Sequence, residues 1–145
     1  METIQRIVVA GILIEQGKIL LVHRVGSQSS YPGSWELPSG EKQANEDCFN
    51  CLVRKIRKEV GISAYVDRPV SVFDYQMERG DTRIKTTQIN FLTKRVDSRQ
   101  HIRLSSVYRQ YKYFDRDELD RCQINPAIKN VLTITFDNLA NPARV

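Results

Sequence analysis

Runs of apolar residues divide the chain into several strands and two helices. Two runs rich in β-branched residues, 6–15 and 18–25, flank a Gln-Gly pair and predict a hairpin or two neighbouring strands. Gly, Pro and Ser residues then predict a loop at 26–34. Later strand-like runs occur at 64–77, 83–95 and 108–114, and a turn at 78–81 joins the first two of them. Strands therefore make up most of the predicted structure.

Two stretches have the spacing of an amphipathic helix. Before Gly61, apolar residues recur at steps of three and four, which predicts a helix with Asn45 as N-cap, Glu46 in its first turn and Gly61 at its end. The same spacing after Asn125 predicts a second helix, with Asn125 as N-cap and Pro126 in the first helical position. Strands with interspersed helices predict an α+β fold, in which a mixed sheet carries helices on its faces.

The composition is typical of a folded protein. The 145 residues are 41% hydrophobic and 27% charged, which favours one domain over 1–145. No apolar run approaches the roughly 20 residues that span a bilayer, and the N-terminus lacks the pattern of a signal peptide, so we expect a cytoplasmic protein. The net charge of +5 suits an anionic partner such as a nucleotide, a phosphorylated metabolite or nucleic acid.

The three cysteines do not indicate a disulfide framework or a zinc site. Cys48 and Cys51 form a single Cys-x-x-Cys pair, Cys122 is distant, and the chain has only two histidines. We interpret all three as free thiols.

Residues 40–62 carry the most specific pattern in the chain. A glycine is followed by a glutamate and by a helix that ends in a charged cluster and a second glycine; the residues are Gly40, Glu46, Arg54, Ile56, Glu59, Gly61 and Ile62. Together with the approach Trp-Glu-Leu-Pro-Ser-Gly, this stretch resembles the Nudix box, the signature of hydrolases that act on a nucleoside diphosphate linked to another moiety. The resemblance implies a Nudix fold, an α-β-α sandwich with a mixed β-sheet flanked by helices.

The resemblance also implies a metal site on the helix. In the family, a carboxylate cluster binds Mg²⁺ or Mn²⁺, which bridges the pyrophosphate and helps to generate the attacking hydroxide. It implies that Glu59 and the backbone carbonyl of Ser39 are metal ligands, and that Glu59 and Arg54 are catalytic residues. The alternative for Glu59 is a salt bridge with Lys55.

Two departures from the family pattern affect this metal site. Lys55 and Lys58 stand where the family has glutamates, and their spacing places them on the helix face of Glu59. Unit charges about 5 Å apart interact by roughly 3 kcal/mol at an effective dielectric constant of about 20, and a divalent ion by about twice that. We therefore expect the lysines to weaken Mg²⁺ binding. In addition, Val107 and Tyr108 occupy positions where a similar stretch of the family often has Glu-His.

The sequence leaves two interpretations of the lysines open. Lys55 and Lys58 either bind the diphosphate directly, in place of the metal's charge, or form a solvated helix face that complements the helix dipole. Arg24, Glu36 and Asn125 are further candidates for substrate binding. Their alternatives are an exposed arginine at a strand end, a carboxylate paired with a basic neighbour, and an N-cap.

These observations predict a Nudix-type hydrolase of nucleoside diphosphate-linked compounds, whose altered metal site weakens Mg²⁺-dependent turnover. The alternative is a non-catalytic Nudix-fold module that binds or senses nucleotides. We expect a nucleoside diphosphate derivative or a related phosphoanhydride as partner, and Mg²⁺ or Mn²⁺ as cofactor if the protein is active. We expect neither a membrane nor a nucleic-acid partner, and we predict a homodimer.

Overall fold

The computed structural model describes residues 1–24 and 34–140, in which strands predominate. The elements, in chain order, are β1 (Glu2–Glu15), β2 (Lys18–Arg24), β3 (Trp35–Glu36), β4 (Ser39–Glu41), α1 (Cys48–Val60), β5 (Ala64–Arg79), β6 (Thr82–Arg95), β7 (Tyr108–Phe114), the 3-10 helix η2 (Asp117–Arg121) and α2 (Pro126–Ala140). The long strands and both helices agree with the sequence prediction, whereas β3, β4 and η2 are too short to produce a periodic pattern. The loop predicted at 26–34 lies, except for Ser34, outside the described residues.

The strands form a mixed sheet in the order β3-β2-β1-β6-β5, with β4 paired to β1 and β7 paired to β2. β1 runs parallel to β6 from Glu2 to Leu13. Its antiparallel pairing with β2 is confined to Ile14 and Glu15, next to the turn that joins the two strands. Nearer its middle, β1 pairs with β4 instead. The sheet therefore divides into two parts beside β1, and the cavity described below lies at this division.

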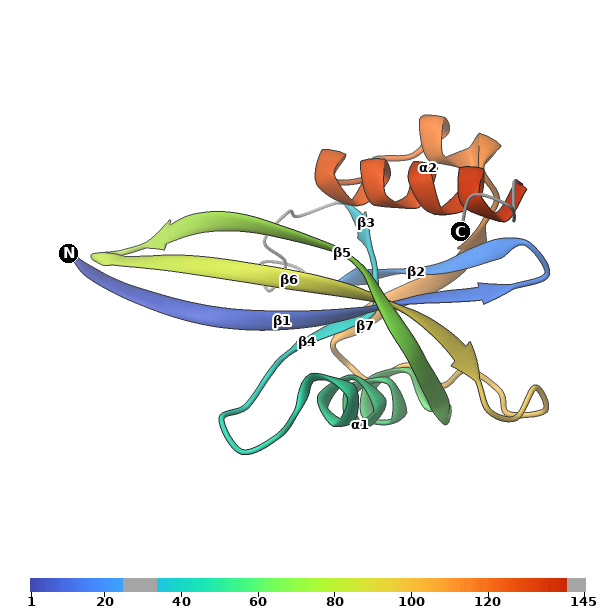
Figure 1. Cartoon of the computed structure of the whole chain (residues 1–145), viewed down its shortest axis with the longest axis horizontal. Helices are drawn as coiled ribbons and strands as arrows, with labels where there is room; N and C mark the ends of the chain where they lie inside the picture. The colour runs from blue at the N-terminus through green and yellow to red at the C-terminus, as the bar shows by residue number, and fades with distance from the viewer. Residues whose placement is uncertain (25–33, 141–145) are drawn as a thin grey trace.

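The two helices cover opposite faces of the strands, and β1, β5 and β6 extend beyond both helices (Figure 1). On one face, Leu52 and Ile56 of α1 belong to a core cluster that contains Val9 of β1. On the other face, Leu132 of α2 belongs to a cluster that contains Ile12 of β1. This arrangement confirms the predicted mixed sheet with helices on its faces. No helix in the described part of the chain is long and apolar enough to cross a bilayer.

The capping residues agree with the sequence prediction at two of the three places. Gly61 ends α1 with φ +78°, and its N–H donates to the carbonyl of Ile56. Asn125 Oδ1 accepts a hydrogen bond from the backbone N–H of Ala127 at 2.8 Å, as expected of an N-cap. The prediction of Asn45 as N-cap of α1 is wrong, because the Asp47 carboxylate holds that position. Asp47 Oδ1 accepts from the N–H of Asn50 at 2.7 Å, and Glu46 therefore lies before the helix rather than in its first turn.

Candidate functional site

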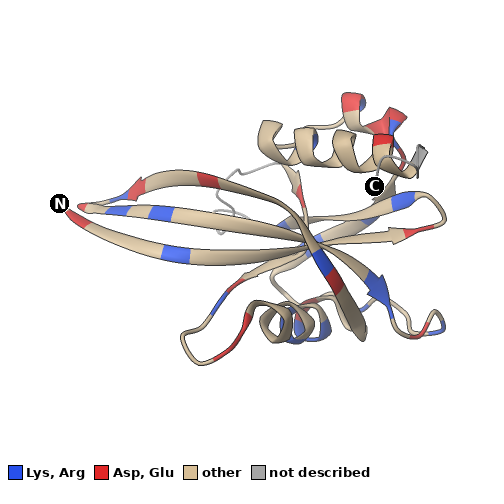
Figure 2. Ribbon diagram, in the orientation of Figure 1, with Lys and Arg blue, Asp and Glu red and all other residues tan. Residues whose placement is uncertain are grey.

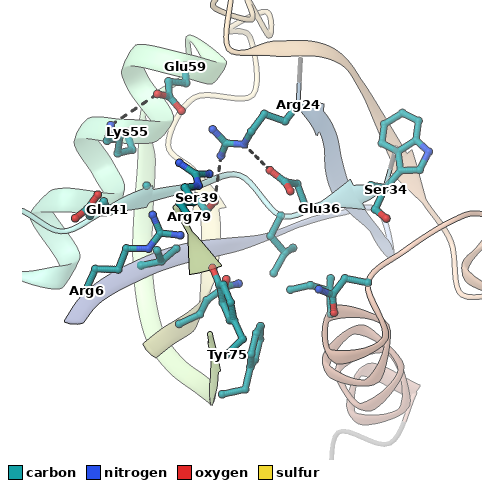
Figure 3. A pocket seen from close by; sticks show the side chains of 18 residues that line it. Arg6, Arg24, Ser34, Glu36, Ser39, Glu41, Lys55, Glu59, Tyr75 and Arg79 are labelled. Atoms are coloured by element: carbon teal, nitrogen blue, oxygen red, sulfur yellow. Dashed lines mark hydrogen bonds and ion pairs between the residues drawn. The ribbon is translucent and has the colours of Figure 1, made fainter. Parts of the chain in front are cut away.

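A cavity of about 300 Å³ opens where β1 separates from β2. Its size is at the lower end of the range for small-molecule sites. α1, α2 and several strands contribute to its walls (Figure 3). Six of the residues predicted from the sequence line this one cavity: Arg24, Glu36, Ser39, Lys55, Glu59 and Asn125. The structure thus brings together residues from distant parts of the chain.

Lys55 and Glu59 lie on the wall that α1 contributes. Glu59 is buried, and its carboxylate Oε1 is 3.8 Å from the ammonium Nζ of Lys55, so the salt bridge given above as the alternative for Glu59 is present, one helical turn apart. The roles of Glu59 in metal binding and catalysis stay predictions. The aliphatic part of Lys55 lies directly over Gly40, since a Cβ added at Gly40 would be only 2.4 Å from Lys55 Cγ. The glycine therefore makes room for the lysine, and the lysine's charge faces the cavity.

Arg24 and Glu36 form a second ion pair inside the cavity. They extend from the neighbouring strands β2 and β3, and Arg24 Nε donates to Glu36 Oε1 at 2.8 Å. The Arg24 guanidinium also lies 5.2 Å from the ring centre of Tyr108. Burial lowers the pKa of Arg24, but the proximity of Tyr108 and the hydrogen bond to Glu36 outweigh this effect, and the pKa is raised. Arg24 is therefore a permanent positive charge in this site.

Tyr108 fixes the backbone of Ser39 on the same wall. Its hydroxyl donates to the carbonyl oxygen of Ser39 at 3.2 Å and accepts a hydrogen bond from the N–H of Ser39 at 3.1 Å. A hydroxyl can do both at once, because it has one donor and two acceptor positions. Burial, the largest effect, raises the pKa of Tyr108, so the hydroxyl stays protonated and remains a donor. This contact has no signal in the sequence beyond the absence of the Glu-His pair.

Two predicted site residues lie away from the cavity. The Arg54 guanidinium holds the Glu46 carboxylate through two hydrogen bonds, Nη2 to Oε1 at 2.6 Å and Nε to Oε2 at 3.0 Å. It thereby ties the segment before α1 to the helix. Lys58 is exposed and is not among the residues that line the cavity. The predicted roles of Arg54 in catalysis and of Lys58 in substrate binding stay predictions.

The oxygen atoms in this cavity do not fit the metal site that the Nudix box implies. Lys55 is the nearest cation to Glu59, Glu36 is bound to Arg24, and the Ser39 carbonyl uses one of its two acceptor positions for Tyr108. Within 1–24 and 34–140, no three His, Cys, Asp or Glu side chains are grouped so that they could hold a metal ion. A hard divalent cation needs several free oxygen ligands, and here cationic groups hold the carboxylates of α1 and β3.

The cavity also contains residues that the sequence did not single out. Arg6 of β1, Tyr75 and Arg79 of β5 and Gln88 of β6 also line it; Figure 3 labels the first three of them. Gln88 is buried and donates to the side chain of Asn90. These residues belong to strands whose long-range pairing is not encoded in any local motif, so the sequence alone offered no way to place them here.

A protein-family model matches most of the chain. The model of the NUDIX domain matches residues 4–133. The CTP pyrophosphohydrolase of Escherichia coli strain K12 is 42% identical over 64 residues, a match that spans 44% of this chain and about half (47%) of that relative. The nucleoside triphosphatase NudI of Salmonella heidelberg is 24% identical over 139 residues, 90% of this chain and 96% of that protein.

Solved structures show the same fold. The E. coli ORF135 protein is 26% identical with a TM-score of 0.69, and the match covers 96% of this chain and 94% of that chain. The MutT protein of Methanosarcina mazei is 19% identical with a TM-score of 0.74, and the match covers 97% of this chain and 99% of that chain. Both matches span nearly the whole of each chain, so this chain shares its fold with these proteins.

Proposed function

Because the chain belongs to the Nudix family, we propose that it binds a nucleoside di- or triphosphate derivative in the cavity beside α1, and that it hydrolyses this ligand only slowly with Mg²⁺. In this proposal, Lys55 and Arg24 supply the positive charge that the phosphates require. Glu59 positions the Lys55 ammonium. The names of the relatives, a CTP pyrophosphohydrolase and a nucleoside triphosphatase, support a phosphoanhydride as the ligand.

The position of Lys55 is the observation that carries this proposal. Its side chain lies against Gly40, so its ammonium is held at the cavity and not free in solvent. A phosphate oxygen about 4 Å from such a charge gains roughly 4 kcal/mol at an effective dielectric constant of about 20. The same charge repels a divalent cation from Glu59. Phosphate binding without a metal and weak metal-dependent turnover therefore have one common cause.

A second candidate function is nucleotide binding without any turnover. The contact between Tyr108 and Ser39 favours it, because the hydroxyl donates to the backbone oxygen that the family uses as a metal ligand. Both candidates require the same ligand and the same cavity. They differ only in whether hydrolysis with Mg²⁺ or Mn²⁺ is measurable above the background rate.

The experiment combines calorimetric binding with a hydrolysis assay on a panel of nucleoside di- and triphosphate derivatives, with Mg²⁺, with Mn²⁺ and with chelator. We expect binding that survives the chelator, and hydrolysis that is slow with both metals. Fast metal-dependent hydrolysis that Glu59→Gln abolishes would show that the lysines are tolerated, and would overturn the proposal of slow turnover. Loss of all binding in chelator would overturn the metal-free mode.

Replacing one charged residue of α1 at a time tests which of them binds the nucleotide. Lys55→Gln is expected to weaken nucleotide binding in chelator about tenfold, since a hydrogen bond to a charged group contributes roughly 1.5–3 kcal/mol. Arg57→Gln removes the same charge from the exposed side of the same helix and serves as the matched control. Lys58→Gln tests the predicted role of Lys58 in binding. The homodimer and the cytoplasmic location predicted above stay predictions.

A further inference from the structure

Two arginines that line the cavity have no carboxylate partner among the described residues. Arg6 of β1 is half-buried, and its Nε donates to the hydroxyl of Thr86 at 2.8 Å. Arg79 lies at the end of β5 and reaches the same cavity. Neither arginine forms an ion pair with any residue in the described part of the chain. Arg24 and Lys55, by contrast, each face a glutamate.

Strand register explains why these two arginines face the same cavity. Arg6 is opposite Thr86 on β6, and Thr86 is opposite Tyr75 on β5, so the three side chains share one face of the sheet. Arg79 follows Tyr75 by four residues and lies on the same face, because side chains alternate along a strand. Basic residues occur on all three strands of the projecting arm formed by β1, β5 and β6 (Figure 2).

The close-up of the cavity shows both guanidinium groups turned inward, on the side of Ser39 (Figure 3). Glu41 is the one acidic residue of the cavity wall, within 1–24 and 34–140, that has no ion pair, and it is exposed. Two cations directed into one cavity repel each other unless an anion lies between them. A guanidinium also presents paired N–H groups that match the oxygens of a phosphate.

We propose that Arg6 and Arg79 form a second anion subsite, which binds the unsubstituted terminal phosphate of a phosphoanhydride whose inner phosphates lie against Lys55 and Arg24. This inference rests on the proposed function. A terminal phosphate carries close to two negative charges at neutral pH, whereas a phosphate esterified on both sides carries one. The subsite therefore selects a nucleoside triphosphate, or inorganic polyphosphate, over a nucleoside diphosphate that ends in a neutral sugar.

The test measures binding to the full chain in chelator by calorimetry, with three probes: a nucleoside triphosphate, inorganic triphosphate and a nucleoside diphosphate sugar. Arg6→Gln and Arg79→Gln are each expected to weaken binding of both triphosphates about tenfold. Binding of the diphosphate sugar is expected to change less than about twofold. The matched control is Lys85→Gln, which removes a charge next to Thr86 on the opposite face of the arm.

The outcomes separate this subsite from the proposed function. If inorganic triphosphate binding depends on both arginines but no nucleotide binds, the subsite stands and the proposed function fails. If nucleotides bind through Lys55 and the arginine variants bind all three probes like the unmodified chain, the subsite is refuted and the function stands. The subsite is also refuted if the arginine variants lose as much affinity for the diphosphate sugar as for the triphosphates. The same holds if Lys85→Gln weakens triphosphate binding as much as they do. Arg79 is exposed, so its replacement tests the subsite even if Arg6→Gln disturbs the sheet.

Discussion

Reversing the charge of Lys55 and Lys58 should convert the anion site into a cation site. In the double variant Lys55→Glu/Lys58→Glu, a carboxylate at position 55 replaces an ammonium that lies 3.8 Å from Glu59 Oε1. Glu59 is buried, so a second carboxylate beside it is repelled strongly unless a cation binds between the two. We therefore expect the variant to bind Mn²⁺ or Mg²⁺ at Glu59 more tightly than the unmodified chain, in which we propose that Lys55 repels these ions.

The size of the change follows from the geometry. A divalent ion about 5 Å from an ammonium is repelled by roughly 7 kcal/mol at an effective dielectric constant of about 20, and a carboxylate at that distance attracts it equally. Solvent screening and side-chain motion reduce this upper limit, and the exposed Lys58 contributes less than Lys55. We expect a gain of at least about 3 kcal/mol in Mn²⁺ affinity, a factor of roughly one hundred in Kd.

Two measurements check this prediction without reference to catalysis. Calorimetric titration or electron paramagnetic resonance gives the Kd for Mn²⁺ directly. Thermal unfolding gives an independent signal, because a ligand that binds only the folded state raises the Tm. In chelator, the double variant should unfold at a lower temperature than the unmodified chain, since two carboxylates one helical turn apart repel each other. Added Mn²⁺ should reverse this loss.

The control places a new carboxylate on the wrong side of the helix. Arg57→Glu makes the same change of charge as Lys55→Glu on an exposed part of α1. If Arg57→Glu raises Mn²⁺ affinity as much as Lys55→Glu does, the effect is general attraction to a less positive protein, and the reasoning from position is refuted. An unchanged Kd in the double variant refutes it as well, because the carboxylates at 55 and 59 would then not act together.

Three further predictions concern packing, reactivity and pH. Gly40→Ala should destabilise the fold by about 1–3 kcal/mol through overlap with Lys55, and the loss should largely vanish when Lys55→Ala is added, as chemical denaturation of the four proteins will show. Burial raises the pKa of Cys51 to about 11, so at pH 8 iodoacetamide should alkylate Cys48 much faster than Cys51 by mass spectrometry. The hydrogen bond from Arg54 lowers the pKa of Glu46 from 4.5 to about 2. The ionised Glu46 carboxylate therefore contributes to stability above pH 4.5, and this contribution is lost as the pH falls toward 2. The Tm of Glu46→Gln should be lower than that of the unmodified chain above pH 4.5, and the difference should disappear toward pH 2.

The sequence predicted the long strands, both helices and the α1 wall because all three depend on local spacing. Residues three and four apart share a helix face, so the approach of Lys55 to Glu59 followed from their spacing on the predicted helix. The N-cap was harder to place because Asn45, Glu46 and Asp47 follow one another and the first and third are both good caps. The structure selects Asp47, since the Glu46 side chain binds Arg54 and the N–H of Gln43.

The parts of the cavity outside α1 depend on contacts between segments that are distant in the sequence. Tyr108 bonds to Ser39 across 69 positions, and Arg6 bonds to Thr86 across 80. The second contact needs the parallel register of β1 and β6, which neither strand specifies by itself. A one-residue shift of that register would turn Arg6 to the opposite face and remove it from the cavity. Such positions are set by the packing of the whole sheet and have no local signature.

The pattern of paired and unpaired charges indicates which kind of ligand the cavity accepts. On the α1 side, the acidic and carbonyl oxygens already have partners within the protein: Glu59 has Lys55 and Ser39 has Tyr108. On the arm side, Arg6 and Arg79 have no acidic partner among the described residues. A site built to bind a cation would show the reverse, with carboxylates that lack a counter-charge. Among the described residues of the wall, two arginines but only one carboxylate, the exposed Glu41, lack an ion pair, so the excess charge is positive. An anion therefore lowers the electrostatic energy of this cavity and a metal ion raises it.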